Sequence, residues 1–285
     1  TIYSTGSAAR ITARGVVIAA GTLGSNVLLA NLKHGGSLPG ISDRLGELVR
    51  TNSESILTVR LPEDRGTWND VAISSSIHVD ADTHIEFVTY GRRGDFMSLL
   101  YTSLVGEGTR LTRPLMWLGG MLRHPLRGIK TFWPVGWSKC SVMFLVMQAL
   151  DNAIALRAKK RWFRRGYTLS TEQHADKPNP TFIAAGNAAA AWLAQHTGGI
   201  AQSMILEAAA NIPTTAHLLG GAVIARDAGS GVVDDQLRVF GYRNLLVCDG
   251  AAMPANPGVN PSLTITALAE HAMAHIPLAS AASTA

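Results

Sequence analysis

The sequence is poor in the features that define several large protein classes. Its 285 residues include only two cysteines, Cys140 and Cys248, which lie far apart in apolar surroundings and give neither a disulfide framework nor a metal-ligand spacing. Charged residues make up 16% of the chain and the net charge is +5, an excess too small to indicate a nucleic-acid binder. With 47% hydrophobic residues, the chain can nevertheless bury a sizeable core.

Long hydrophobic runs are also absent. The most apolar stretch, from Cys140 to Leu150, is far shorter than the ~20 residues that a spanning helix needs, so we expect a buried strand there. The N-terminus has neither an initiating methionine nor the apolar core of a signal peptide. We therefore expect a protein of the cytoplasm or of a membrane surface rather than a secreted one.

Much of the positive charge lies in one stretch, residues 157–165, around Trp162 and Phe163. Such a stretch is usually a solvated face of a hairpin or helix, and the alternative is peripheral contact with an anionic membrane. Its basic residues are Arg157, Lys159, Lys160, Arg161, Arg164 and Arg165.

Hydrophobic periodicity and turn residues predict an α+β fold. A β-branched run ending at Gly21 precedes a helical pattern around residues 26–30. Paired strands are expected at 72–79 and 84–90, further strands at 55–61, 140–148, 155–162, 167–170 and 244–250, and helices at 116–129, 180–195 and 263–275. We expect strand 140–148 to pair with strand 155–162, and the tail from Ala279 to be frayed.

One ligand-binding signal lies at the first junction of strand, turn and helix. A glycine-rich turn such as Gly21 to Gly24 lets the backbone approach a ligand at the helix N-terminus, where free N–H groups favour anionic groups. Many such turns only pack a strand against a helix, so this signal alone is weak.

A second cluster of turn residues lies in the last third of the chain. His217 shortly precedes a Gly-Gly pair, and Asn260 lies in a loop with three prolines between a buried strand and a helix. A histidine there could take a proton from an alcohol, and an amide could orient a hydroxyl or a carbonyl group. Taken singly, a loop histidine is more often structural and an asparagine at a helix start is more often a cap. Only the joint arrangement favours function.

This arrangement resembles a known family. Thr215 to Gly221 and the run DGAAMPANPGVNPSLTITALAEHA, which starts at Asp249, are similar to the C-terminal signature of glucose-methanol-choline (GMC) oxidoreductases, and within them to the cholesterol oxidase-like branch. The runs VVIAAGTLGSNVLLA and LVRTNSES, the latter with Asn52, resemble the segments with which that family returns to its flavin domain.

The resemblance implies an FAD enzyme in which a hydride passes from a substrate C–OH to the flavin. His217 would assist deprotonation of the substrate hydroxyl, and Asn260 would lie near substrate and flavin. The implied substrate is a hydrophobic alcohol, a 3β-hydroxysterol such as cholesterol. The positions with implied cofactor contacts are Gly21, Asp249, Gly250, Asn260, Pro261 and Ser262.

The resemblance also implies a division into two domains. Residues 1–65 and 205–280 would belong to the FAD-binding domain, and residues 66–204 would form a substrate-binding domain with an antiparallel sheet and helices. Candidates for an apolar substrate pocket are Trp117, Met121, Trp133, Trp137 and Met143, although tryptophan and methionine at helical spacing usually fill a core.

Two departures from the family pattern bear on the site. Leu218 stands where a proline usually follows the family's histidine, so we expect a looser turn. The sterol-oxidising branch also uses a glutamate for isomerisation, and an ungapped comparison places none between Arg92 and Leu99. Asp95 is the nearest carboxylate, and Glu86 lies on the preceding strand. Sterol oxidation is therefore better supported than isomerisation.

No G-x-G-x-x-G motif occurs in the sequence, although GMC enzymes begin with one that cradles the FAD pyrophosphate. We expect a C-terminal portion that acts with an N-terminal FAD-binding half, and we expect the 285-residue chain alone not to hold FAD. Two other interpretations stay open, a degenerate lipid-binding module without redox activity and a membrane-associated helper that binds through residues 157–165.

Overall fold

The computed structural model describes residues 2–4, 7–9, 11–162, 166–173 and 177–277. The helices are α1 Gly21–His34, α2 Thr112–Arg123, α3 Pro125–Phe132, α4 Trp137–Cys140, α5 Ala184–Thr197, α6 Ile205–Ala210 and α7 Ser262–Ala274, with short 3-10 helices η1 Thr67–Asn69, η2 Asp95–Leu100 and η3 Gly250–Ala252. The strands are β1 Ile2–Ser4, β2 Ser7–Ala9, β3 Val16–Ile18, β4 Arg50–Thr51, β5 Ser55–Arg60, β6 Ile73–His78, β7 Thr83–Val88, β8 Tyr101–Ser103, β9 Ser141–Gln148, β10 Ile154–Lys160, β11 Tyr167–Gln173, β12 Ile200–Met204, β13 Leu218–Leu219 and β14 Leu245–Val247.

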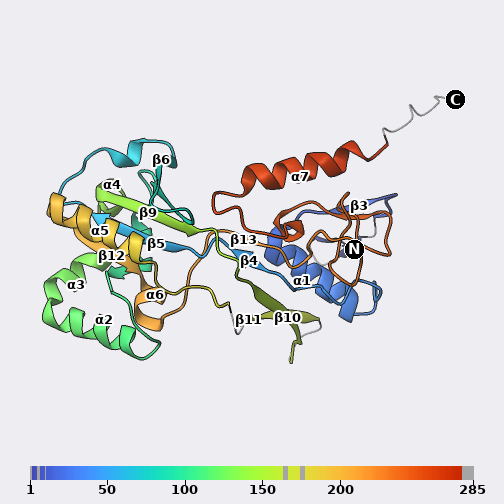
Figure 1. Cartoon of the computed structure of the whole chain (residues 1–285), viewed down its shortest axis with the longest axis horizontal. Coiled ribbons are helices and arrows are strands. Elements are labelled where there is room, and N and C mark those ends of the chain that lie inside the picture. The colour runs from blue at the N-terminus through green and yellow to red at the C-terminus, as the bar shows by residue number, and fades with distance from the viewer. Residues whose placement is uncertain (1, 5–6, 10, 163–165, 174–176, 278–285) are drawn as a thin grey trace.

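A six-stranded antiparallel sheet forms one end of the elongated molecule (Figure 1). Its strand order is β6-β7-β9-β5-β12-β8, so β9 lies in the centre and makes antiparallel pairs with β7 and β5. The β-branched and aromatic residues of these strands favour this pleated, buried arrangement. Helix α5 packs its alanine-rich face on the sheet, over a core that includes Leu57, Ile85, Phe144 and Val146. Helices α2 and α3 contact β8 at the edge of the sheet.

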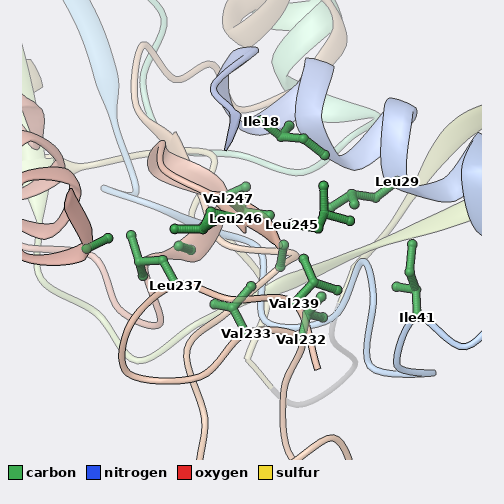
Figure 2. Packing of buried hydrophobic residues seen from close by; sticks show 14 residues of the cluster. Ile18, Leu29, Ile41, Val232, Val233, Leu237, Val239, Leu245, Leu246 and Val247 are labelled. Carbon is green, nitrogen blue, oxygen red and sulfur yellow. The ribbon is translucent and has the colours of Figure 1, made fainter. Parts of the chain in front are cut away.

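A parallel pair of short strands, β3 and β14, lies at the other end with α1 and α7 (Figure 1). The hydrophobic core there joins Ile18 of β3, Leu29 of α1 and the β14 residues to loop valines from residues 232–239 (Figure 2). The antiparallel pair β4–β13 lies between the two ends of the molecule (Figure 1), and β10–β11 forms a separate two-stranded sheet next to α1. The strand–turn–helix unit predicted around Gly21 is therefore confirmed.

The α+β fold and most of the expected elements are confirmed, but two predictions are wrong. The expected helix 116–129 is two helices, because Pro125 has no N–H and restricts His124 to a non-helical conformation, so that α2 ends at Arg123. Strand β9 does not pair with β10. It lies in the large sheet, and β10 pairs with β11 instead. Alternation along a strand cannot reveal which neighbour it pairs with.

The division into two domains stays a prediction, and the large sheet begins before residue 66, with β5. Among the helices of the described ranges, none combines the length and the apolar character needed to cross a membrane. The expected frayed tail and part of the basic stretch, Phe163 to Arg165, lie outside the described residues.

Candidate functional site

His217 lies immediately before β13, in a loop that the backbone fixes from both sides. Thr215 Oγ1 accepts a hydrogen bond from the His217 backbone N–H at 3.0 Å. After the histidine, Leu218 pairs with Thr51 of β4, and its carbonyl accepts from Thr22 Oγ1 at 2.6 Å. The looser turn expected from Leu218 is therefore wrong, because β-pairing holds this residue instead of a proline ring. Gly220 then needs a positive φ of 82°, which glycine adopts without strain.

The imidazole of His217 is paired with a buried carboxylate. Glu54 Oε1 lies 2.5 Å from His217 Nδ1, and the Glu54 side chain is fully buried. The second oxygen, Oε2, accepts a hydrogen bond from the backbone N–H of Ala216. In a neutral imidazole, a carboxylate that accepts at Nδ1 places the proton there and leaves Nε2 as an acceptor.

Asn260 is held by a second buried carboxylate. Its Nδ2 donates to Glu86 Oε1 at 2.9 Å and to Oε2 at 2.7 Å. Glu86 lies on β7 and is 5% exposed, and His84, on the same face of the strand, has its Nδ1 3.8 Å from Glu86 Oε1. The amide nitrogen of Asn260 thus faces Glu86, and its Oδ1 has no hydrogen-bond partner within the described ranges.

Asn52 brings the two loops together. Its Nδ2 donates to the carbonyl of Val259 at 3.0 Å and lies 3.3 Å from His217 Nδ1. Since Nδ1 already donates to Glu54, we interpret the second contact as packing rather than a hydrogen bond. One fully buried asparagine thus contacts both His217 and the residue next to Asn260. The predicted pair is therefore linked in space, although 43 positions separate the two residues in the sequence.

Asp249 fixes the turn that carries Gly250. Its Oδ1 accepts from the Ala251 N–H at 2.8 Å, and its Oδ2 accepts from Ser25 Oγ of α1. The Gly250 carbonyl accepts from the Gly220 N–H at 2.8 Å, which joins this turn to the loop after His217. A Cβ on Gly250 would lie 2.8 Å from Thr22 Oγ1, so only glycine fits.

Two helix N-termini are placed for an anionic or polar ligand. Gly21 starts α1 with a φ of 72°, and no atom lies within 4 Å of the position that its Cβ would take. Ser262 starts α7 directly after Pro261, and the N–H groups of the first three helical residues have no partner in the part of the chain that the structure describes. The open space at Gly21 and these unpaired donors fit a cofactor, but contact of these positions with FAD stays a prediction.

A third buried carboxylate supports the segment before His217. Glu207 of α6 accepts from Thr214 Oγ1 at 2.5 Å and from Ser55 Oγ at 2.9 Å. Burial raises the pKa of Glu207 above its ordinary value, against the opposing effect of these hydrogen bonds and of Arg113. This residue therefore ties α6, β5 and the loop that leads to the histidine.

Other predicted residues lie elsewhere. Asp95 caps the segment before β9 by accepting from Gly136 N and from Ser138 N and Oγ, so it is structural. Its burial opposes ionisation, but the hydrogen bonds from Ser138 and Gly136 outweigh that effect and lower its pKa.

Of the five apolar pocket candidates, Trp137 and Met143 are buried in a core cluster with Tyr101, and Trp133 is exposed. The core interpretation is therefore the better one for Trp137 and Met143, and Trp133 fits neither a core nor an enclosed pocket.

Glu54 and Glu86 are the functional candidates that sequence reasoning did not assign. Glu86 could have been found because it stands between Ile85 and Phe87 in a strand, THIEFV, whose first four residues are buried. Glu54 lies two residues after Asn52 in the run TNSES, directly before a buried strand. A carboxylate at such a position is not hydrated and therefore needs a hydrogen-bond donor or a cation beside it.

The fold and the site define an α+β protein in which buried carboxylates hold a histidine and an asparagine on neighbouring loops. Residues 147–269 match the family model of GMC oxidoreductases. This segment is similar to the corresponding part of GMC oxidoreductases, a family of FAD-dependent enzymes that act on CH–OH donors.

The chain is similar to two curated cholesterol oxidases. It is 45% identical to one from Acinetobacter baumannii over 266 residues, which cover 93% of this chain and 47% of that protein. It is 44% identical to one from Mycobacterium tuberculosis over 273 residues, covering 92% and 46%. The chain thus spans about half the length of the curated relatives that it matches.

The fold is also similar to a solved structure, the pyridoxine 4-oxidase from Mesorbium loti. The TM-score is 0.51 at 13% sequence identity, and the match covers 92% of this chain and 51% of the other. At this identity the likeness concerns the fold alone.

Proposed function

We propose that this chain carries the substrate-side catalytic groups of an FAD-dependent oxidoreductase for a hydrophobic alcohol, a 3β-hydroxysterol such as cholesterol. The observation that carries the proposal is the buried Glu54–His217 pair, which Asn52 links to the loop of Asn260. The two cholesterol oxidases, at 44% and 45% identity, support the substrate class.

His217 is the proposed base. With Nδ1 held by Glu54, Nε2 can accept the hydroxyl proton of the alcohol while the carbinol carbon gives up its hydride. Loss of one proton and one hydride converts the alcohol to a carbonyl compound. The negative charge of buried Glu54 then stabilises the imidazolium ion that forms. When bound, FAD supplies the acceptor of the hydride.

Asn260 and Glu86 are the proposed orienting pair. The Asn260 amide, whose orientation Glu86 fixes, would border the substrate carbon that gives up its hydride, while the single hydroxyl proton points at His217. The Glu86 carboxylate lies beside it and can move a proton at a carbon next to the product carbonyl. Glu86 therefore gives isomerisation a candidate base that Asp95 does not provide.

The residues at the two helix N-termini are those that would hold the flavin. The N–H groups of Ser262 and its neighbours in α7 would favour negative charge on a reduced ring system, and Gly21 would allow close approach at α1. Asp249 and Gly250 would keep the connecting backbone in place. No described cluster of histidine, cysteine and acidic residues could hold a metal ion.

An N-terminal FAD-binding half is the proposed partner. Parallel sheets are normally covered on both faces, yet Val16 and Val17 of β3 are 50% and 46% exposed. Beside these strands lies an open hollow of about 1040 Å³, lined by residues that include Arg14, Asn244, Leu246 and Ala272. Further strands and helices of an FAD-binding domain would cover this apolar surface.

Product analysis tests the substrate and reaction class. The chain assembled with a GMC-type FAD-binding half would be incubated with cholesterol and, separately, with simple primary alcohols. We expect loss of two hydrogens from the sterol by mass spectrometry, with much slower turnover of the short alcohols. A protein that binds FAD and oxidises no alcohol would instead favour a lipid-binding module without redox activity.

A further inference from the structure

We propose that the exposed face of α2 and α3 is a docking surface for an anionic lipid bilayer. This face, the α2–α3 ridge, consists of six apolar side chains: Leu115, Leu118, Leu122, Leu126, Ile129 and Trp133. Their exposure ranges from 49% for Leu118 to 81% for Leu126. A run of large apolar side chains this exposed on a soluble surface marks an interaction site.

Within each helix the ridge residues recur at helical spacing, which places them on one face of that helix. Leu115, Leu118 and Leu122 are three and four positions apart in α2, and Leu126, Ile129 and Trp133 repeat that spacing along α3 and its end. The opposite side of α2 is anchored: Arg113 is buried and donates to Asn211 Oδ1 at 3.1 Å, and Trp117 Nε1 donates to Thr102 Oγ1 at 2.8 Å. The ridge therefore faces outward and not into the sheet.

Charge indicates what covers the ridge. From Gly108 to Leu150 the sequence contains no aspartate and no glutamate. The exposed basic side chains beside the ridge, Arg110, Arg123, Arg127 and Lys130, take part in no ion pair within the described ranges. An apolar strip with a tryptophan, flanked by arginine and lysine and free of acidic groups, is typical of helices that lie in the interface of an anionic membrane.

Two other occupants fit less well. The α2–α3 ridge lies at the opposite end of the molecule from β3 and α7, where an FAD-binding half would dock (Figure 1). A symmetric second copy would bring Arg123, Arg127 and Lys130 near the same residues of its partner, with no acidic group in this segment to compensate. A bilayer with acidic headgroups has neither problem.

The basic stretch at residues 157–165, the first candidate for membrane contact, is less suited. Arg157 is paired with Glu172 at 3.0 Å and lies 3.6 Å from Glu47, so acidic groups already neutralise part of it. The contact predicted from this stretch and the one inferred for the α2–α3 ridge can be separated by mutation.

Vesicle sedimentation of the 285-residue chain tests the inference without any catalytic readout, so its outcome is independent of the proposed redox function. We expect binding to phosphatidylcholine vesicles that contain phosphatidylserine and much weaker binding to phosphatidylcholine alone. Replacing Leu122→Asp together with Leu126→Asp, or neutralising Arg123, Arg127 and Lys130 to glutamine, should weaken binding to the anionic vesicles by about tenfold or more.

Matched controls are Leu263→Asp, an equally exposed leucine on α7, and Lys159→Gln with Lys160→Gln in β10. Both should bind as the wild type does. Circular dichroism verifies folding, and the charge variant keeps the test decisive should the aspartate variant fail to fold. The inference is overturned by unchanged binding of the ridge variants, by loss of binding only in the Lys159 and Lys160 control, or by a dimer that the aspartate variant dissociates without any vesicle binding.

Discussion

At the residue scale, the site consists of two pairs, Glu54 with His217 and Glu86 with Asn260. In each pair a buried carboxylate determines which atoms of its partner remain available to a ligand. Breaking one partner of a buried pair leaves the other without compensation, which costs more than the pair itself contributes. Each pair therefore makes a separate prediction.

Glu54→Gln should invert the tautomer of His217. The glutamine carbonyl would accept from the Ala216 N–H, and its NH₂ group would face Nδ1, so the proton would move to Nε2. We expect kcat to fall by about 10²–10⁴-fold with little change in KM, since the base is lost and substrate contacts stay. Nitrogen NMR of the imidazole reports the tautomer without any turnover. Glu47→Gln, in a surface pair with Arg44, is the control, and an unchanged tautomer in the Glu54 variant refutes the assignment.

Asn260→Ala should destabilise the chain through Glu86. The variant removes the amide nitrogen that donates to a carboxylate that is 5% exposed, which we expect to cost about 1–3 kcal/mol of unfolding free energy. In a Glu86→Gln background the loss should be smaller, because no charge is left unpaired. Urea unfolding of the four proteins measures the coupling, and additive effects would show that the two side chains do not interact.

At the element scale, close packing between segments distant in sequence positions the site. The Asp249–Gly250 turn packs against α1 and β13, and α6 holds the loop before His217. These contacts make two further predictions, one on packing and one on pH.

Gly250→Ala should destabilise the fold, whereas Gly120→Ala should not. The new methyl group at position 250 would lie 2.8 Å from Thr22 Oγ1 and 3.1 Å from Leu219 Cδ2, and we expect a cost of about 1–3 kcal/mol. At position 120 no atom lies within 4 Å, so alanine should stabilise α2 by roughly 0.5–1 kcal/mol through its higher helix propensity. Thermal unfolding compares the two, and equal shifts would contradict this packing.

Glu207 should make stability fall as pH rises. Because burial raises its pKa in the folded state, the folded chain holds the proton more tightly than the unfolded chain. Its contribution is therefore fully present below the ordinary pKa of 4.5 and is lost as pH rises through the folded-state value. Glu207→Gln mimics the protonated form, so the unfolding free energy of wild type minus variant should decrease from pH 4 to pH 7. A difference that does not vary with pH contradicts this expectation.

At the scale of the whole molecule, the chain contains the residues proposed for the flavin end of a cofactor site but no G-x-G-x-x-G motif. We predict that the 285-residue chain purified alone does not retain stoichiometric FAD. After assembly with a GMC-type FAD-binding half, the complex should retain it. Visible absorbance of the purified protein decides between the two results. Val17→Lys, on the exposed face of β3, should weaken that assembly, and the exposed Leu126→Asp should not.

The sequence predicted the ends of this chain better than its middle. The strand–turn–helix at Gly21 and the loop from Asp249 to Ser262 have local signals, because glycine and proline restrict the backbone where they stand. The pairing partner of β9 depends on tertiary contacts. The helix break at His124 depends on one proline within an apolar run. Glu54 and Glu86 were not assigned because a buried pair is defined by distance in space, and 163 positions separate Glu54 from His217.

The most direct test of the proposed function is anaerobic stopped-flow reduction of the flavin by cholesterol in the chain assembled with an FAD-binding half. The wild-type protein should lose its oxidised-flavin absorbance on mixing. His217→Ala should slow that reduction by about 10²–10⁴-fold while FAD stays bound. Flavin that cholesterol reduces equally fast in both proteins, or that no alcohol reduces in the wild type, would contradict the role of His217 as the base of an alcohol-oxidising site.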